Sequence, residues 1–197
     1  AYEFMPSLVG SEMCIRDRVS YHRKAAEYYL KLKTNEGVLE AIYHLIKGYR
    51  QTEAAALAIQ NGPTLIESGY ANALLREISL LEESEIPDYW PYILILRGDI
   101  FSKLAKPEAA MKQYDVCVSY TESAKPKGGK EVFSYLWFGV SKEFLKARAL
   151  AYLRMAELFV AQGKKEEAKD AYGAALKILR DLGAPEAFDI EKRMAAL

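Results

Sequence analysis

The sequence predicts an all-α protein, an α-solenoid built from antiparallel helix pairs. From Val19 onward, apolar residues recur at helical spacing almost without a break, and no stretch alternates long enough to predict a strand. In addition, residues 91–124 and 149–182 repeat one pattern of small and aromatic residues at constant spacing. Helix pairs that repeat in this way bury a continuous core by stacking on their neighbours.

The composition fits a globular array with balanced charge. The chain has 197 residues, 51% of them apolar, which is enough to bury a real core. It carries 27 basic and 27 acidic residues, so charge gives no reason to expect direct binding to nucleic acid. No run reaches the roughly 18 apolar residues of a membrane span, and the start lacks a signal peptide, so we expect no membrane partner. Two cysteines, Cys14 and Cys117, make no disulfide framework, and we expect a cytoplasmic protein.

Residues 19–90 are predicted to form degenerate helix pairs. The strings "HRKAAEYYLKLK" and "VLEAIYHLIKGY" each carry one apolar face, and Gly48 suits the turn after the second. The alanine-rich helix that follows is predicted to end at Gly62, with Pro63 opening a short new helix. A shortened hairpin is then predicted to turn at Gly69.

The later residues, 91–197, contain the two matching units. Small residues fall on small residues and aromatic on aromatic, which predicts helices in close contact with aromatic side chains filling the space between pairs. The matched positions are Gly98 with Ala156, Phe101 with Phe159, Ala105 with Gly163, Ala110 with Ala168, Tyr114 with Tyr172, and Cys117 with Ala175. Residues 125–148 are inserted between the units, with a loop at "KPKGGK" and an extension of the next helix. Residues 185–197 are predicted to form a terminal helix.

This spacing resembles the tetratricopeptide repeat (TPR), a helix–turn–helix unit of about 34 residues. The pattern departs from it at Arg97, where leucine is usual, and near Arg180, where no proline ends the second unit. The resemblance implies that the first helix of each pair lines a concave binding face. The candidate residues on that face are Tyr92, Ile95, Asp99, Lys103, Leu153, Glu157 and Val160.

The candidate face predicts the kind of partner. TPR proteins that capture acidic chaperone tails use a basic residue and an asparagine at two positions of this face. Here the first is held by Ile95 and Leu153 and the second by Asp99 and Glu157, so such tails are not expected. An apolar, mildly acidic groove favours a helical, apolar or basic protein segment, and a small inducer is the other possibility. The aromatic run "FSYLWF" (133–138) either adds to this surface or fills the core.

A second resemblance covers residues 20–83. "YHRKAAEYYLKL" followed by "LEAIYHLIKGYRQTEAAALAIQNG" is similar to the junction in MalT-like signalling ATPases of the STAND class, where a winged-helix domain gives way to a helical-repeat array. The resemblance implies a sensor or interaction module whose ATPase and winged-helix domains lie upstream. A free-standing TPR scaffold is the alternative.

No catalytic constellation is expected within these residues. "KPKGGKE" lacks the spacing and the hydroxyl of a phosphate-binding loop. His22 and His44 have no cysteine or carboxylate at metal-ligand spacing, and Cys117 stands at a small, buried repeat position. We therefore expect no enzyme activity, cofactor or metal.

Asp99 and Glu157 occupy corresponding places in the two units. Paired acids can perform acid–base chemistry, but no apolar or basic residue is predicted to tune them. They are interpreted as solvated or partner-facing charges.

The start of the chain has a different character. "LVGSEMCIRD", residues 8–17, resembles residue for residue the translation of a transposase-type sequencing adaptor. A natural disordered arm is the alternative interpretation. Residues 1–18 are accordingly expected to be non-native and unstructured, and the origin of residues 1–6 stays open.

Overall fold

A computed structural model describes residues 6–123 and 142–197 of the chain, with side chains from residue 15 onward. The described residues form nine α-helices and no strand, which confirms the predicted all-α class. The chain divides into two compact units, residues 1–89 and 90–197, which are described separately. Among the described helices, none has the length and apolarity needed to cross a membrane.

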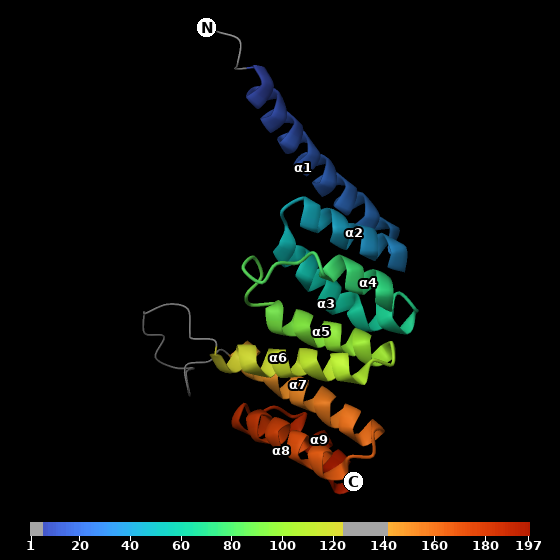
Figure 1. The fold of residues 1–197 in the computed structure, drawn as a ribbon, viewed down its shortest axis with the longest axis vertical. Helices are drawn as coiled ribbons and strands as arrows, with labels where there is room; N and C mark the ends of the chain where they lie inside the picture. The colour runs from blue at the N-terminus through green and yellow to red at the C-terminus, as the bar shows by residue number, and fades with distance from the viewer. Residues whose placement is uncertain (1–5, 124–141) are drawn as a thin grey trace. The chain divides into compact units, whose positions relative to one another are not determined.

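Unit 1 contains four helices packed in succession. They are α1 (Pro6–Leu32), α2 (Asn35–Lys47), α3 (Gln51–Glu67) and α4 (Ala71–Ile78). α1 packs on α2, α2 on α3, and α4 against both α2 and α3 (Figure 1). The Thr34 hydroxyl accepts a hydrogen bond from the Gly37 amide at 3.0 Å and so caps α2. Unit 1 is therefore a set of sequential helix pairs, as the periodicity predicts.

The prediction that a helix ends at Gly62 is wrong, because α3 continues through Pro63 to Glu67. Proline inside a helix removes one backbone hydrogen bond and costs about 3 kcal/mol. Here buried residues on both sides of the proline offset that cost. Ala55 and Ala58 before it, and Leu65 after it, are all 0% exposed. Tertiary packing on both halves of the helix outweighs the local break signal.

Gly48 lies in the turn between α2 and α3, as predicted, but it is not the left-handed residue of that turn. Tyr49, with a φ of 57°, adopts the left-handed conformation, whereas Gly48 has a φ of −87°. Gly48 instead allows close approach of α1, since a Cβ there would lie 3.2 Å from Arg23 Cγ and 3.1 Å from the His44 carbonyl oxygen. The later turn does use glycine as predicted, with Gly69 at a φ of 89°.

The expectation that residues 1–18 are unstructured is not met over residues 6–18, which form the first part of α1. Residues 15–18 are exposed, and from residue 15 onward Ala26 is the first fully buried residue of the helix. Once the packed part of a helix has formed, each added residue gains a hydrogen bond without a new nucleation step. The helix therefore extends beyond the segment that packs.

Unit 2 contains α5 (Trp90–Lys103), α6 (Pro107–Ser123), α7 (Lys142–Ala161), α8 (Lys165–Asp181) and α9 (Ala187–Ala195). The predicted unit 91–124 corresponds to the pair α5–α6, and the unit 149–182 to the pair α7–α8. α7 contacts α5, α6 and α8, and α9 packs on α8 (Figure 1). α7 begins at Lys142, ahead of its repeat unit. The predicted "KPKGGK" loop and the "FSYLWF" run lie outside the described residues.

Apart from the two turn positions, 105 and 163, the repeat positions lie in the core of unit 2. Tyr114 covers Gly98 so closely that a Cβ on the glycine would stand 2.2 Å from the tyrosine Cε1. Phe101 and Phe159 are partly buried against the two hydrophobic clusters of the unit. The buried positions are Gly98, Ala110, Tyr114 and Cys117 in the first pair, and Ala156, Ala168, Tyr172 and Ala175 in the second.

The two interhelical turns share one backbone conformation. Ala105 (φ 56°) and Gly163 (φ 73°) are both left-handed, which costs a non-glycine residue about 1–2 kcal/mol. Both side chains would be exposed. We expect Ala105→Gly to raise the free energy of unfolding by about 0.5–1 kcal/mol and Gly163→Ala to lower it by about 1 kcal/mol, measured by urea unfolding. Shifts of the same sign for the two substitutions would contradict this account.

Candidate binding face

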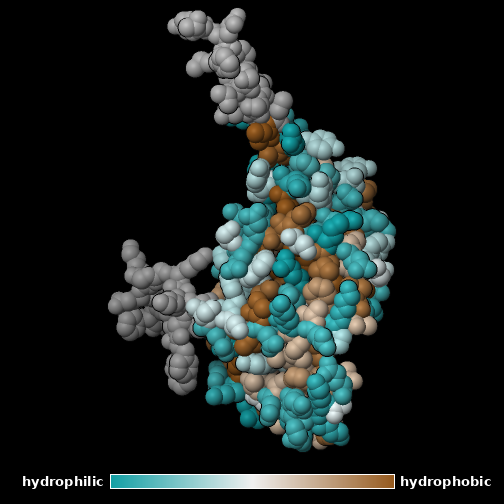
Figure 2. Space-filling model, in the orientation of Figure 1, coloured by the Kyte–Doolittle hydropathy of each residue, from teal (hydrophilic) through white to brown (hydrophobic). Residues whose placement is uncertain are grey.

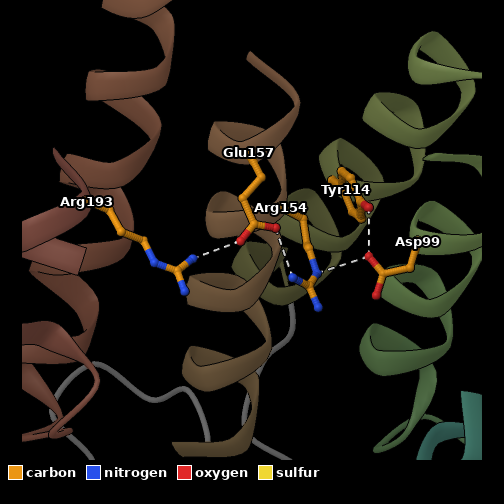
Figure 3. Close-up of polar contacts among 5 residues, drawn as sticks. All are labelled: Asp99, Tyr114, Arg154, Glu157 and Arg193. Carbon is orange, nitrogen blue, oxygen red and sulfur yellow. Dashed lines mark hydrogen bonds and ion pairs between the residues drawn. The ribbon is translucent and has the colours of Figure 1, made fainter. Parts of the chain in front are cut away.

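A chain of polar contacts joins four helices of unit 2 (Figure 3). The Tyr114 hydroxyl of α6 donates to Asp99 Oδ1 of α5 at 2.8 Å, and Arg154 Nε of α7 lies 3.1 Å from the same oxygen. Arg154 Nη1 is also 2.9 Å from Glu157 Oε2, and Arg193 Nη1 of α9 is 3.0 Å from Glu157 Oε1. These five residues are called the polar ladder below. It links α5 and α7, the first helices of the two pairs, with the terminal helix α9.

Solvent exposure increases along the polar ladder. Tyr114 is 1% exposed, and the side chain of Asp99 is 24% exposed. The side chains of Arg154 and Glu157 are 37% and 38% exposed, and that of Arg193 is 58% exposed. One end of the ladder is therefore a core interaction, whereas the other end is open to solvent.

Arg154 corrects the expectation that no basic residue tunes the two acids. Burial raises the pKa of Asp99, while Arg154 and the hydrogen bond from Tyr114 oppose that increase. Asp99 is accordingly held by protein groups and is not a solvated charge. Glu157 pairs with both Arg154 and Arg193. The negative charges of Asp99 and Glu157 are therefore offset by arginines, whereas the sequence predicts a mildly acidic groove.

The remaining predicted face residues have different environments. Lys103 is exposed, and Val160 is 41% exposed. The Tyr92 hydroxyl lies 3.1 Å from both the backbone oxygen and Oε2 of Glu143 on α7. Leu153 is partly buried against the α7–α8 core. Of the predicted face residues, Lys103, Val160 and Glu157 are therefore the ones most accessible to solvent.

Ile95 does not line an open groove. It is 3% exposed and belongs to a core cluster that includes Ala147 and Ala151 of α7. Both alanines belong to the part of α7 that begins at Lys142. The sequence predicts that this helix is extended but does not predict what the extension packs against. Ile95 is thus a core residue of the α5–α7 contact.

Cys117 has the surroundings of an inert thiol. It is 0% exposed, and its Sγ lies 3.5 Å from the Pro91 carbonyl oxygen, which can accept from the thiol. Burial raises the pKa of Cys117 to about 12, while Arg148 acts in the opposite direction. The protonated thiol stabilises the native state below about pH 8.5, and this contribution is lost as the pH rises toward the native pKa.

We expect Cys117 to react with iodoacetamide more than about 1000-fold more slowly in the native protein than in urea at about pH 8, because both the thiolate fraction and access are reduced. The measurement uses a Cys14→Ser variant, in which Cys117 is the single thiol. Native alkylation within tenfold of the unfolded rate would be the contrary result.

Two contributions to the site are absent from the sequence prediction. Arg154 stands three residues before Glu157, and this spacing in the sequence is enough to predict an ion pair on one helix. Arg193 reaches Glu157 from α9 across 36 positions, and no local pattern signals that contact. In unit 1, His22 and His44 lie in direct contact, which the sequence analysis does not predict.

On the face in view in Figure 2, hydrophilic and hydrophobic side chains of the described residues are interleaved. Within the described part of the chain, no three histidine, cysteine, aspartate or glutamate side chains are grouped to hold a metal ion.

Comparison with protein-family models, with curated proteins and with solved structures finds no match to this chain.

Proposed function

We propose that this protein is a helical-repeat interaction module that binds a protein segment on the face formed by α5, α7 and α9. The observation that carries the proposal is the open end of the polar ladder. Glu157 is held there by Arg193, whose side chain is 58% exposed. Lys103 and Val160 add exposed charge and apolar surface on the first helices of the two pairs.

The chemistry favours a helical segment with basic and apolar side chains. An exposed ion pair such as Glu157–Arg193 contributes about 0–1 kcal/mol. A basic side chain of a partner can therefore take the place of Arg193 at Glu157 with little loss, while an apolar neighbour on the same helix face covers Val160. A small inducer that carries a cationic group is the alternative ligand for the same position.

Selection from a library of displayed amphipathic helical peptides tests this proposal. We expect peptides enriched on the full chain to carry basic residues next to apolar ones. Their dissociation constants should rise about tenfold for a Glu157→Gln variant, because a charge-assisted hydrogen bond is lost. Calorimetric titration of individual peptides provides the measurement.

Glu166→Gln is the matched control, since Glu166 is a similarly charge-paired residue on α8 with a side chain that is 83% exposed. It should leave peptide affinity unchanged. Peptides that lose the same affinity in both variants, or in neither, would contradict a binding face at Glu157.

We propose further that the module belongs to a MalT-like STAND signalling protein, in which ligand binding shifts the balance between active and inactive states of an ATPase. The support is the residue pattern of positions 20–83 and the packing of its two leading helices, α1 and α2, against each other. The alternative is a free-standing TPR scaffold without catalytic activity. The gene upstream of Val19 discriminates the two: a phosphate-binding loop and a winged helix support the first, and their absence supports the second.

A further inference from the structure

The two histidines of the chain meet where α1 packs on α2. His22 Nδ1 of α1 lies 2.7 Å from His44 Nδ1 of α2, and the ring centroids are 5.0 Å apart. A hydrogen bond between two Nδ1 atoms needs one nitrogen that donates and one that accepts. The contact therefore requires at least one neutral ring, and two protonated rings cannot form it.

The surroundings of the pair disfavour positive charge. His44 is 8% exposed, so little water reaches its ring. Burial, the second histidine, Lys47 and Arg18 all lower the pKa of His22. The two charged side chains that act on His22, Lys47 of α2 and Arg18 of α1, are both cations.

No carboxylate among the described residues forms an ion pair or hydrogen bond with either imidazole. The acids with partners on the helices packed here bind other groups: Glu36 accepts from Tyr70, Glu53 pairs with Arg50, and Glu77 pairs with Arg76. Arg23 donates to the Gly48 carbonyl oxygen. The other charged side chains described on α1 to α3 are exposed, as is that of Arg23: Arg16, Asp17, Lys24, Glu27, Lys31, Glu40 and Glu67. Among the described side chains of these helices, no acid is bonded to the histidines to compensate a doubly protonated pair.

We propose that His22 and His44 form an acid-sensitive latch that holds α1 on α2 when the pair is neutral and releases α1 when both rings are protonated. In the released or unfolded state, the rings protonate near their ordinary pKa of about 6.5. The latch therefore stabilises the α1–α2 contact above about pH 6.5, and this stabilisation is lost as the pH falls. For each proton that the closed pair excludes, the ratio of closed to open α1 falls by up to about tenfold per pH unit.

The test is hydrogen exchange of the full chain, measured by mass spectrometry with EDTA present. After correction for intrinsic rates, we expect α1 peptides from residues 19–32 to lose protection at least about tenfold between about pH 7.5 and pH 5, relative to peptides of α8. In a His22→Gln variant, whose amide can still hydrogen-bond to His44, this pH dependence should be reduced. Lys24→Gln, an exposed change on the same helix, should retain it.

Nuclear magnetic resonance of the two imidazoles in the unmodified chain is the second measurement. Coupled rings should titrate in two separated steps. Two independent titrations near pH 6.5, or equal pH dependence of α1 in the wild type and in His22→Gln, would overturn the proposal. If His22→Gln does not hold α1 at neutral pH, His44→Gln takes its place, and the imidazole titration still decides.

Discussion

Replacing Gly98 by alanine is expected to lower the free energy of unfolding by about 2 kcal/mol. The added Cβ would stand 2.2 Å from Tyr114 Cε1 and 2.7 Å from its Cδ1. Tyr114 has little room to move, because it is 1% exposed and donates to Asp99 at 2.8 Å. Overpacking of this kind costs about 3 kcal/mol, and the better helix propensity of alanine returns about 1 kcal/mol. Urea unfolding followed by circular dichroism measures the difference.

The second helix pair provides the control for Gly98. Ala156 occupies the position that matches Gly98 and is 0% exposed beside Tyr172, so a Cβ is accommodated there. Ala156→Gly should destabilise by about 1 kcal/mol through helix propensity alone. Combining Gly98→Ala with Tyr114→Leu should cost less than the sum of the two single changes, because the smaller side chain relieves the clash. A stabilised Gly98→Ala variant would show that the helices separate easily.

The same pairs show how much of the fold the sequence predicts. Close helix contacts leave a local record, since small residues must face aromatic ones, and positions 98 and 114 therefore predict the pair α5–α6. Contacts between residues far apart in the chain have no such local pattern. Examples are the contact of Arg193 on α9 with Glu157, and the place of Ala147 of α7 in the cluster that contains Ile95. For this reason the helix pairs are predictable, while the charge state of the face and the burial of Ile95 are not.

Local signals also fail where packing opposes them. Pro63 is a strong break signal, yet α3 continues because both of its halves are buried. Residues 6–18 have no apolar period, yet they are part of α1, and residues 15–18 are helical although exposed. In both cases the prediction used propensity, and the outcome was set by tertiary contacts or by helix propagation.

Replacing Arg154 by methionine is expected to destabilise the protein by about 2 kcal/mol at neutral pH. The substitution leaves Asp99 and Glu157 without the cation that lies between them, at 3.1 and 2.9 Å respectively. Removing one partner of a fully buried ion pair costs about 3–5 kcal/mol. The smaller value here reflects solvent screening, since the Arg154 side chain is 37% exposed and that of Asp99 is 24% exposed.

The pH dependence of Arg154→Met separates lost electrostatics from lost packing. Burial already raises the pKa of Asp99, and loss of Arg154 raises it further. An acid with a raised native pKa gives stability at low pH that is lost as the pH rises through that pKa. The deficit of the variant relative to the wild type should therefore be smaller at about pH 4 than at about pH 7. Adding Asp99→Asn should recover about 1 kcal/mol at neutral pH, because the uncompensated carboxylate is removed. A deficit that is independent of pH, with no recovery in the double variant, would mean that Arg154 acts through its alkyl chain and that the polar ladder has no electrostatic role.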